Sequence, residues 1–134
     1  MDEREDQIIA RMRRLYEAFN RGEFDRVMEM AHPDIELVRA GGLAPIKGAA
    51  AVRAWMEPDA FEKQETEPLD FTVNGDKVLV HARTRNRGAG SGIELENEGF
   101  QLWTLGADDL VVRHEFFTAD RKAEALRAAG IADG

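Results

Sequence analysis

The strongest constraint on the fold is an alternation of apolar and polar side chains that starts at Leu69 and continues to Phe117. Successive side chains of a β-strand point to opposite faces, so this pattern predicts strands that each bury one face. Three turn signals divide the region: an Asn-Gly pair at 74–75, a glycine-rich stretch at 87–92 and GADD at 106–109. Asn-Gly between alternating segments is typical of a tight hairpin. The region therefore predicts an antiparallel meander.

Helical periodicity precedes this alternation. Apolar residues recur every three to four positions from Ile8 to Phe19, which predicts an amphipathic helix that Gly22 ends. The expected elements are helices at 8–19, 24–31, 49–57 and 119–129, and a short strand at 34–38. We therefore expect one α+β domain over residues 1–134, with the helices on one face of a curved antiparallel sheet.

Composition limits the functions that this chain can have. It has 134 residues and no cysteine, which excludes disulfides, thiolate zinc sites and cysteine nucleophiles. Lys and Arg number 18 against 26 Asp and Glu, and a formal charge of −8 works against binding nucleic acid or an anionic membrane. No signal sequence or membrane span is visible, so we expect a cytoplasmic location. The three histidines have no ligand spacing, so we expect neither a metal nor a cofactor.

The hairpin at 100–117 carries two polar side chains inside apolar runs, Gln101 and His114. If GADD is the loop and Leu105 opposes Leu110, Gln101 lies opposite His114, within reach of an amide–imidazole hydrogen bond. One face then carries Gln101, Trp103, Leu105, Leu110, Val112, His114 and Phe116.

Two interpretations of this polar pair remain open. Leaving a buried polar group without a partner costs about 1–3 kcal/mol, so both side chains need partners. Gln101 and His114 either satisfy each other inside a core or line a cavity where a ligand completes their hydrogen bonding. The other face of the hairpin is also half apolar, and we expect a second subunit to cover it.

Several stretches of the chain resemble one family. They are LYEAFNRGEFDRVMEMAHPDIEL, KGAAAVRAWM, GDKVLVHARTRNRGAGSGIELE and WTLGADDLVVRHEFFTADRKAEALRAAGI. Together they resemble the SnoaL-like branch of the nuclear-transport-factor-2-like superfamily. The resemblance implies a cone-shaped α+β roll, in which a curved sheet wraps around N-terminal helices and encloses a pocket. It also implies a homodimer through the outer sheet face.

The same superfamily includes ketosteroid isomerases, polyketide cyclases, epoxide hydrolases and non-catalytic binding domains. The aspartate base of the ketosteroid isomerases aligns with Arg39 here, their acidic oxyanion donor with Gln101, and their helix tyrosine with Leu15, next to Tyr16. Without that base, the resemblance argues against steroid isomerisation. The inward face of the last hairpin has no carboxylate, which argues against epoxide hydrolysis.

Three residues are candidates for catalysis. His114 is suited to acid–base chemistry near neutral pH, Gln101 could donate to a developing oxyanion, and Arg39 could hold an anionic oxygen. Arg39 follows the inward parity of its strand, although a surface ion pair is the alternative. The candidate ligand-binding residues are Trp103, Tyr16, Trp55, Phe116, His81 and Arg83.

The direction of His81 and Arg83 depends on the strand register. They enter the pocket if Leu79 opposes Gln101, and a shift of one residue turns them outward. The first hypothesis for the function is a pocket protein with isomerase-, cyclase- or dehydratase-like acid–base chemistry on a small hydrophobic or carbonyl-containing ligand. The alternative is a non-catalytic ligand-binding or dimerisation module.

Overall fold

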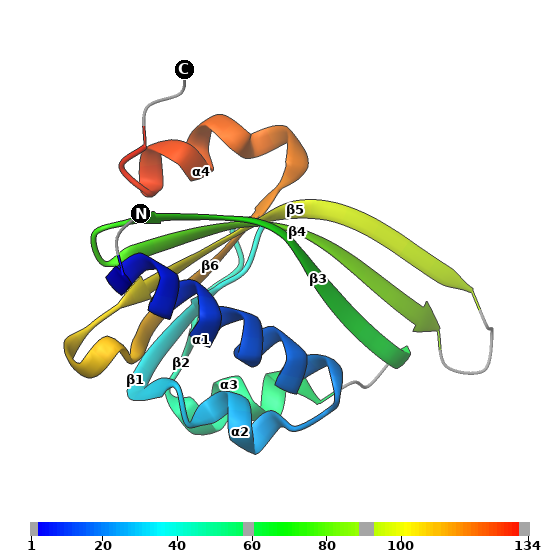
Figure 1. Cartoon of the computed structure of the whole chain (residues 1–134). Coiled ribbons are helices and arrows are strands. Elements are labelled where there is room, and N and C mark those ends of the chain that lie inside the picture. Colours follow the sequence, from blue (N-terminus) through cyan, green and yellow to red (C-terminus); the bar gives the residue numbers. More distant parts are fainter. Residues whose placement is uncertain (1–2, 58–60, 89–92, 132–134) are drawn as a thin grey trace.

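Six strands form one curved, open sheet in this computed structural model, which describes residues 3–57, 61–88 and 93–131 (Figure 1). The strands are β1 (Ala31–Val38), β2 (Ile46–Lys47), β3 (Phe61–Asn74), β4 (Lys77–Gly88), β5 (Glu94–Leu105) and β6 (Val111–Thr118). Their order is β2-β1-β6-β5-β4-β3, and all neighbours are antiparallel except β1 and β6. The α+β prediction is confirmed, but the sheet is mixed because β1 runs parallel to β6.

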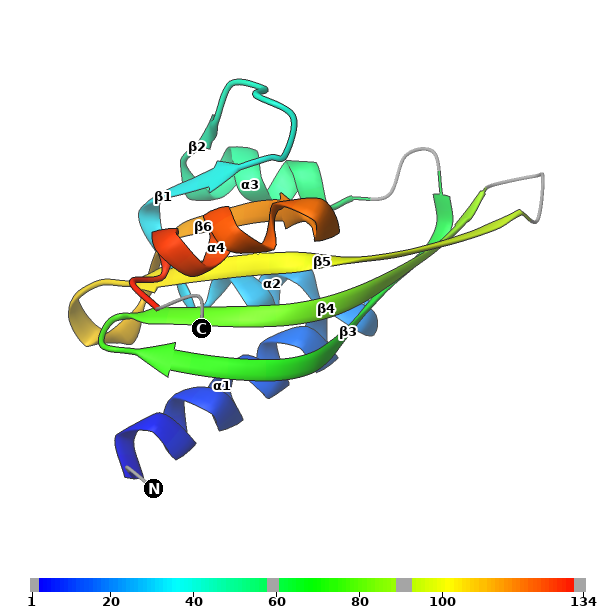
Figure 2. The ribbon, with the colours of Figure 1, turned by 90° about the horizontal axis from the view of Figure 1, so that it is seen from above.

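Helices lie on both faces of the sheet. α1 (Glu3–Asn20), α2 (Phe24–Met28) and α3 (Ala49–Met56) lie on the concave face, and α4 (Lys122–Ala128) lies on the convex face (Figures 1 and 2). Short 3-10 turns, η1 (Ala107–Asp109) and η2 (Ala119–Arg121), flank β6. The expectation that all helices share one face is therefore wrong for α4. None of the helices in the described segments is long and apolar enough to cross a membrane.

The main core lies between the concave face and the three N-terminal helices. Its α1 side is the predicted apolar stripe, and its sheet side comes from inward residues of β1, β4, β5 and β6. The buried residues include Ile8, Met12, Leu15, Tyr16, Ile35, Leu37, Val78, Val80, Trp103, Leu105 and Val111.

A smaller cluster lies on the convex face. Leu79 and Leu102 point outward from the sheet and pack against Ala125 and Ala129 of the C-terminal helical region. The chain's own α4 therefore covers part of the face that a second subunit was expected to cover. A homodimer through the rest of this face stays a prediction.

The β5–β6 loop differs from the predicted one. Asp108 and Asp109 both adopt positive φ angles, 60° and 55°, and the register shifts directly after Thr104. Leu105 consequently lies opposite Val111, not Leu110. The predicted inward position of Val112 is wrong, because the irregularity brings Val111 into the core instead.

The register before this irregularity also differs, but the side-chain faces do not. Trp103 lies opposite His114, and Gln101 lies opposite Phe116. Gln101 and His114 are therefore diagonal neighbours and not a directly opposed pair. All four side chains still face the helices.

Two strands begin earlier than expected. β3 starts at Phe61, eight residues before the visible alternation, and its ladder is interrupted between Pro68 and Asp70. Proline in a sheet is confined to edge strands and bulges, and β3 is one of the two edge strands here. β1 begins at Ala31, so α2 is shorter than predicted and His32 lies in a strand.

Candidate ligand-binding site

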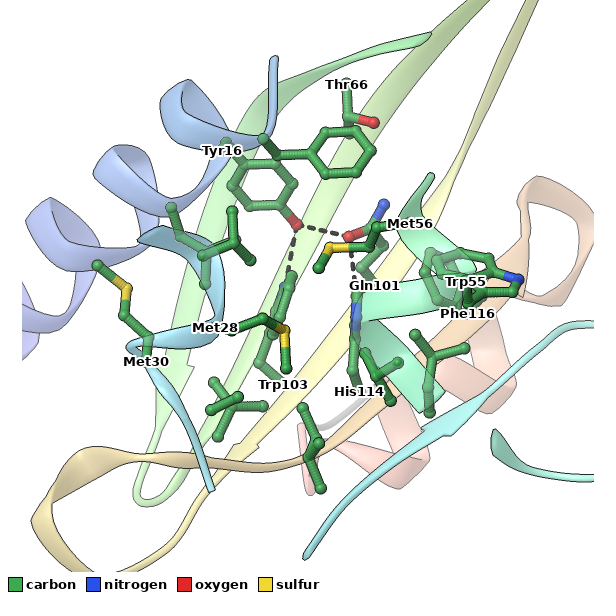
Figure 3. Close-up of a pocket in the computed structure, with 18 of the residues that line it drawn as sticks. Tyr16, Met28, Met30, Trp55, Met56, Thr66, Gln101, Trp103, His114 and Phe116 are labelled. Carbon is green, nitrogen blue, oxygen red and sulfur yellow. Dashed lines mark hydrogen bonds between the residues drawn. The ribbon is translucent and has the colours of Figure 1, made fainter. Parts of the chain in front are cut away.

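A cavity of about 110 Å³ lies between α1, α2, α3 and the concave face of the sheet (Figure 3). A cavity of about 150 Å³ in another protein holds benzene, so the space suits a ligand portion about one ring in size. Met28, Met30 and Met56 line it from the helical side, and flexible thioethers fit irregular apolar shapes. No Asp, Glu, Lys or Arg lines the cavity among the residues that the structure describes.

A chain of hydrogen bonds forms the polar part of the wall. The Trp103 Nε1–H donates to the Tyr16 hydroxyl at 3.0 Å, and this hydroxyl donates to Gln101 Oε1 at 2.7 Å. His114 Nε2 approaches the same oxygen at 3.0 Å. Figure 3 shows these groups pointing toward one another from α1, β5 and β6.

The donors in this chain set its direction. An indole N–H only donates, so the Tyr16 oxygen accepts from Trp103. The Gln101 atom that faces Tyr16 is the amide oxygen, which only accepts, so the tyrosine proton lies in that bond. Because an amide oxygen carries no hydrogen, His114 Nε2 must carry the proton in its bond to Gln101. This leaves the Gln101 amide nitrogen as a donor and His114 Nδ1 as an acceptor, each without another hydrogen-bond partner in the described segments.

Burial keeps this network neutral. It lowers the pKa of His114 from 6.5 to about 3, so the imidazole is uncharged near neutral pH. Burial also raises the pKa of the Tyr16 hydroxyl far above its usual range, and the hydrogen bond from Trp103 offsets only part of this rise. The stacked Trp103 and His114 rings, with centroids 3.5 Å apart, exclude water from one face of the imidazole. The site therefore presents hydrogen-bonding groups without formal charge.

Both open interpretations of Gln101 and His114 describe part of this arrangement. The two side chains hydrogen-bond each other and both also line the cavity. Trp55 and Phe116 line the cavity too, with their ring centroids 5.8 Å apart. Trp55 is 40% exposed, which places it at the edge of the cavity and not in the core.

Thr66 is a lining residue that the sequence did not indicate. The Asn20 amide donates to the Thr66 carbonyl at 2.8 Å and accepts from its N–H at 2.7 Å. The end of α1 thus fixes β3 where its side chains reach the cavity. Residues 62–67 are polar throughout, so no apolar alternation in the sequence indicates Gln64 and Thr66 as lining residues.

His81, Arg83 and Arg39 are not among the described residues that line the cavity. Val80 lies opposite Gln101, so His81 and Arg83 point to the convex face. There His81 contacts Glu98 at 3.0 Å, and Arg83 contacts Glu96 at 3.1 Å. Of the two registers left open by the sequence, the structure has the one that turns these two residues away from the cavity.

Arg39 lies just beyond the end of β1. Its Nη2 donates to the carbonyl of Ala44 at 3.1 Å, and this hydrogen bond links the end of β1 to the loop that follows it. Because the strand ends at Val38, the inward parity assumed for Arg39 does not extend to it. In the described parts of the chain, no group of three or more His, Asp or Glu side chains could hold a metal ion.

Comparison with known proteins decides the family. The profile of the SnoaL-like domain matches residues 12–114. This chain belongs to the SnoaL-like family. No curated protein matches it.

Solved structures share the fold of this SnoaL-like chain at low identity. A SnoaL-like protein from Jannaschia sp. CCS1 is 23% identical with a TM-score of 0.73, and 95% of this chain covers 94% of that one. TerC, co-crystallised with polyporic acid, is 20% identical with a TM-score of 0.72, over 90% and 98% of the two chains. SalBIII, an epoxide hydrolase/cyclase-like enzyme in pyran ring formation, is 18% identical with a TM-score of 0.75, over 88% and 93%.

Proposed function

We propose that this SnoaL-like chain binds a small, uncharged, largely apolar molecule in the cavity, with a carbonyl group at Gln101. The observation that carries the proposal is an apolar lining without charged side chains, into which one neutral polar network projects. A charged ligand group would lose its hydration there and gain no opposite charge.

The polarity of the network supports a carbonyl compound. The Gln101 amide nitrogen is available to donate to a carbonyl oxygen, and His114 Nδ1 is available to accept from a hydroxyl or N–H group. A polar site that pairs with its ligand discriminates strongly against analogues that lack the partner atom. The co-crystal of TerC with polyporic acid supports the use of this fold to bind a small molecule.

Acid–base conversion of the bound carbonyl compound is the second candidate. Gln101 could donate to an enolate oxygen as negative charge develops, as expected for an isomerase, cyclase or dehydratase. The cyclase-like relative SalBIII supports this direction. However, a pKa of about 3 makes His114 a weak base at neutral pH. The site is therefore better suited to binding and orienting a ligand than to general-base catalysis.

The test compares two ligands of the same shape, cyclohexanone and methylenecyclohexane. Cyclohexanone should bind more tightly to the purified protein in ligand-observed NMR titrations, because only its oxygen can accept from Gln101. Gln101→Leu should remove that preference while both compounds still bind. Gln7→Leu on the exposed side of α1 makes the same substitution away from the cavity and should retain it. Failure of both compounds to bind would refute the proposal.

A further inference from the structure

A second hollow adjoins the cavity. It is a groove of about 670 Å³, and three of its lining residues, Thr84, Gln101 and Phe116, also line the cavity. These side chains therefore lie at the boundary that the two spaces share. The donor nitrogen proposed to hold the ligand belongs to Gln101, which lies at this boundary.

The groove exists because the start of β5 extends beyond the end of β6. Their pairing stops at Gly99 opposite Thr118, after which η2 leads the chain away from the sheet. β5 continues through Glu94–Glu98, where its register pairs it with β4 alone. Gly99 permits this close packing, because a Cβ atom there would lie 2.7 Å from the Phe117 carbonyl oxygen.

Phenylalanine and alanine side chains provide much of the groove wall, polar side chains lie among them, and the described lining contains no Lys or Arg. Thr84, Asn97 and Thr118 bring hydroxyl and amide groups, and Glu98 and Asp120 bring carboxylates. The Asp120 carboxylate accepts from the Thr118 hydroxyl. That hydrogen bond lowers the pKa of Asp120, so the carboxylate stays charged at neutral pH. An anionic group placed here would meet these two carboxylates, and Arg83, which lies outside the lining, already pairs with Glu98.

We propose that the bound molecule extends from the cavity past Gln101 and Phe116 into this groove, and that the extension is hydroxylated or cationic. This inference rests on the proposed function, since the ring-sized portion must first occupy the cavity. Hydroxyl or ammonium groups can donate to the carboxylates of the groove, whereas a phosphate or carboxylate can only accept and would be repelled by those carboxylates. The site therefore selects a free polar molecule over one attached to a phosphate-bearing carrier.

Four benzamides test this inference. Benzamide is the ring-sized portion, and N-(2-hydroxyethyl)benzamide, N-(2-aminoethyl)benzamide and N-benzoyl-β-alanine add a neutral, a cationic and an anionic extension. We expect the hydroxyl and amino forms to bind roughly three- to tenfold more tightly than benzamide, and the anionic form to gain nothing. Affinities are measured by ligand-observed NMR at low ionic strength, where exposed charges act over a longer range.

Matched variants separate the groove from general charge effects. Asp120→Asn should reduce the advantage of the amino form over the anionic form. Asp108→Asn changes the net charge equally at the opposite end of the β5–β6 hairpin and should not. Ala119→Trp narrows the groove and should remove the gain from the extensions, whereas Lys122→Trp adds the same side chain outside the groove lining and should not.

The outcomes also separate this inference from the proposed function. The groove is not part of the site if all three extended compounds bind the protein only as tightly as benzamide does. The same conclusion follows if Ala119→Trp leaves the gain in affinity from the extensions intact. If benzamide itself fails to bind, both the proposed function and this inference fail.

Discussion

Acidification should destabilise the fold through His114. Burial lowers the pKa of this imidazole to about 3, whereas in the unfolded chain it regains its ordinary value near 6.5. Between these two values the unfolded chain binds a proton that the folded chain does not. The free energy of unfolding therefore falls as the pH falls from about 6.5 to about 3, and this stability is fully present above the unfolded pKa.

The size of the effect follows from the same shift. Each pH unit inside this window removes about 1.4 kcal/mol from the free energy of unfolding. From pH 7.5 to pH 5.0 the contribution of His114 amounts to about 2 kcal/mol. This figure is set by the unfolded pKa as long as the folded pKa lies below about 4, so it does not depend on how far burial lowers the pKa beyond that point.

Urea denaturation followed by tryptophan fluorescence at these two pH values measures the effect. His114→Gln places an amide that does not titrate beside Gln101, and His114→Phe also lacks a titrating group but loses that hydrogen bond. The other titrating side chains are present in all three proteins, so the difference in pH dependence isolates His114. Wild type should lose about 2 kcal/mol more than either variant. Equal losses in all three would show that the imidazole protonates freely in the fold, and the burial explanation would be wrong.

Two further substitutions test the contacts that build the site. Tyr16→Phe leaves the Trp103 indole N–H without its acceptor and removes a donor from Gln101, so urea denaturation should show a loss of about 1–3 kcal/mol. Asn20→Ala removes both hydrogen bonds to the Thr66 backbone and should also cost about 1–3 kcal/mol. It should weaken cyclohexanone binding as well, because Thr66 lines the cavity; unchanged stability would contradict the role of this contact.

The sequence predicts which face of the sheet a side chain lies on better than it predicts which residue lies opposite on the neighbouring strand. Gln101 was expected opposite His114 and lies opposite Phe116, a difference of two residues. Because side chains alternate with a period of two, a shift of two positions leaves each side chain on its predicted face. On the other side of β5, Val80 and not Leu79 lies opposite Gln101, a shift of one, which reverses every face. This single residue turns His81 outward.

The loops that set these shifts are less legible in the sequence. Aspartate tolerates positive φ better than most residues, but nothing in GADD requires it at both Asp108 and Asp109. Likewise, the parity that pointed Arg39 inward depended on a strand that ends one residue earlier. Periodicity therefore predicts which side chains share a face within an element, and it loses that power where the element bulges or ends.

The chemical character of the site depends on the Gln101 oxygen, which faces both Tyr16 and His114, while Trp103 contributes its ring nitrogen as well as its packing. Tyrosine, glutamine and neutral histidine can each donate or accept, so their presence in the sequence leaves the direction of the network undetermined. In the structure the indole N–H donates to the Tyr16 oxygen, and the Gln101 oxygen, which can only accept, receives hydrogen bonds from Tyr16 and His114. The glutamine oxygen is thereby occupied, and its amide nitrogen becomes the group available to a ligand. The hydrogen bonds on the Gln101 oxygen thus leave its N–H groups to donate, which supports the proposed pairing with a carbonyl oxygen of a ligand.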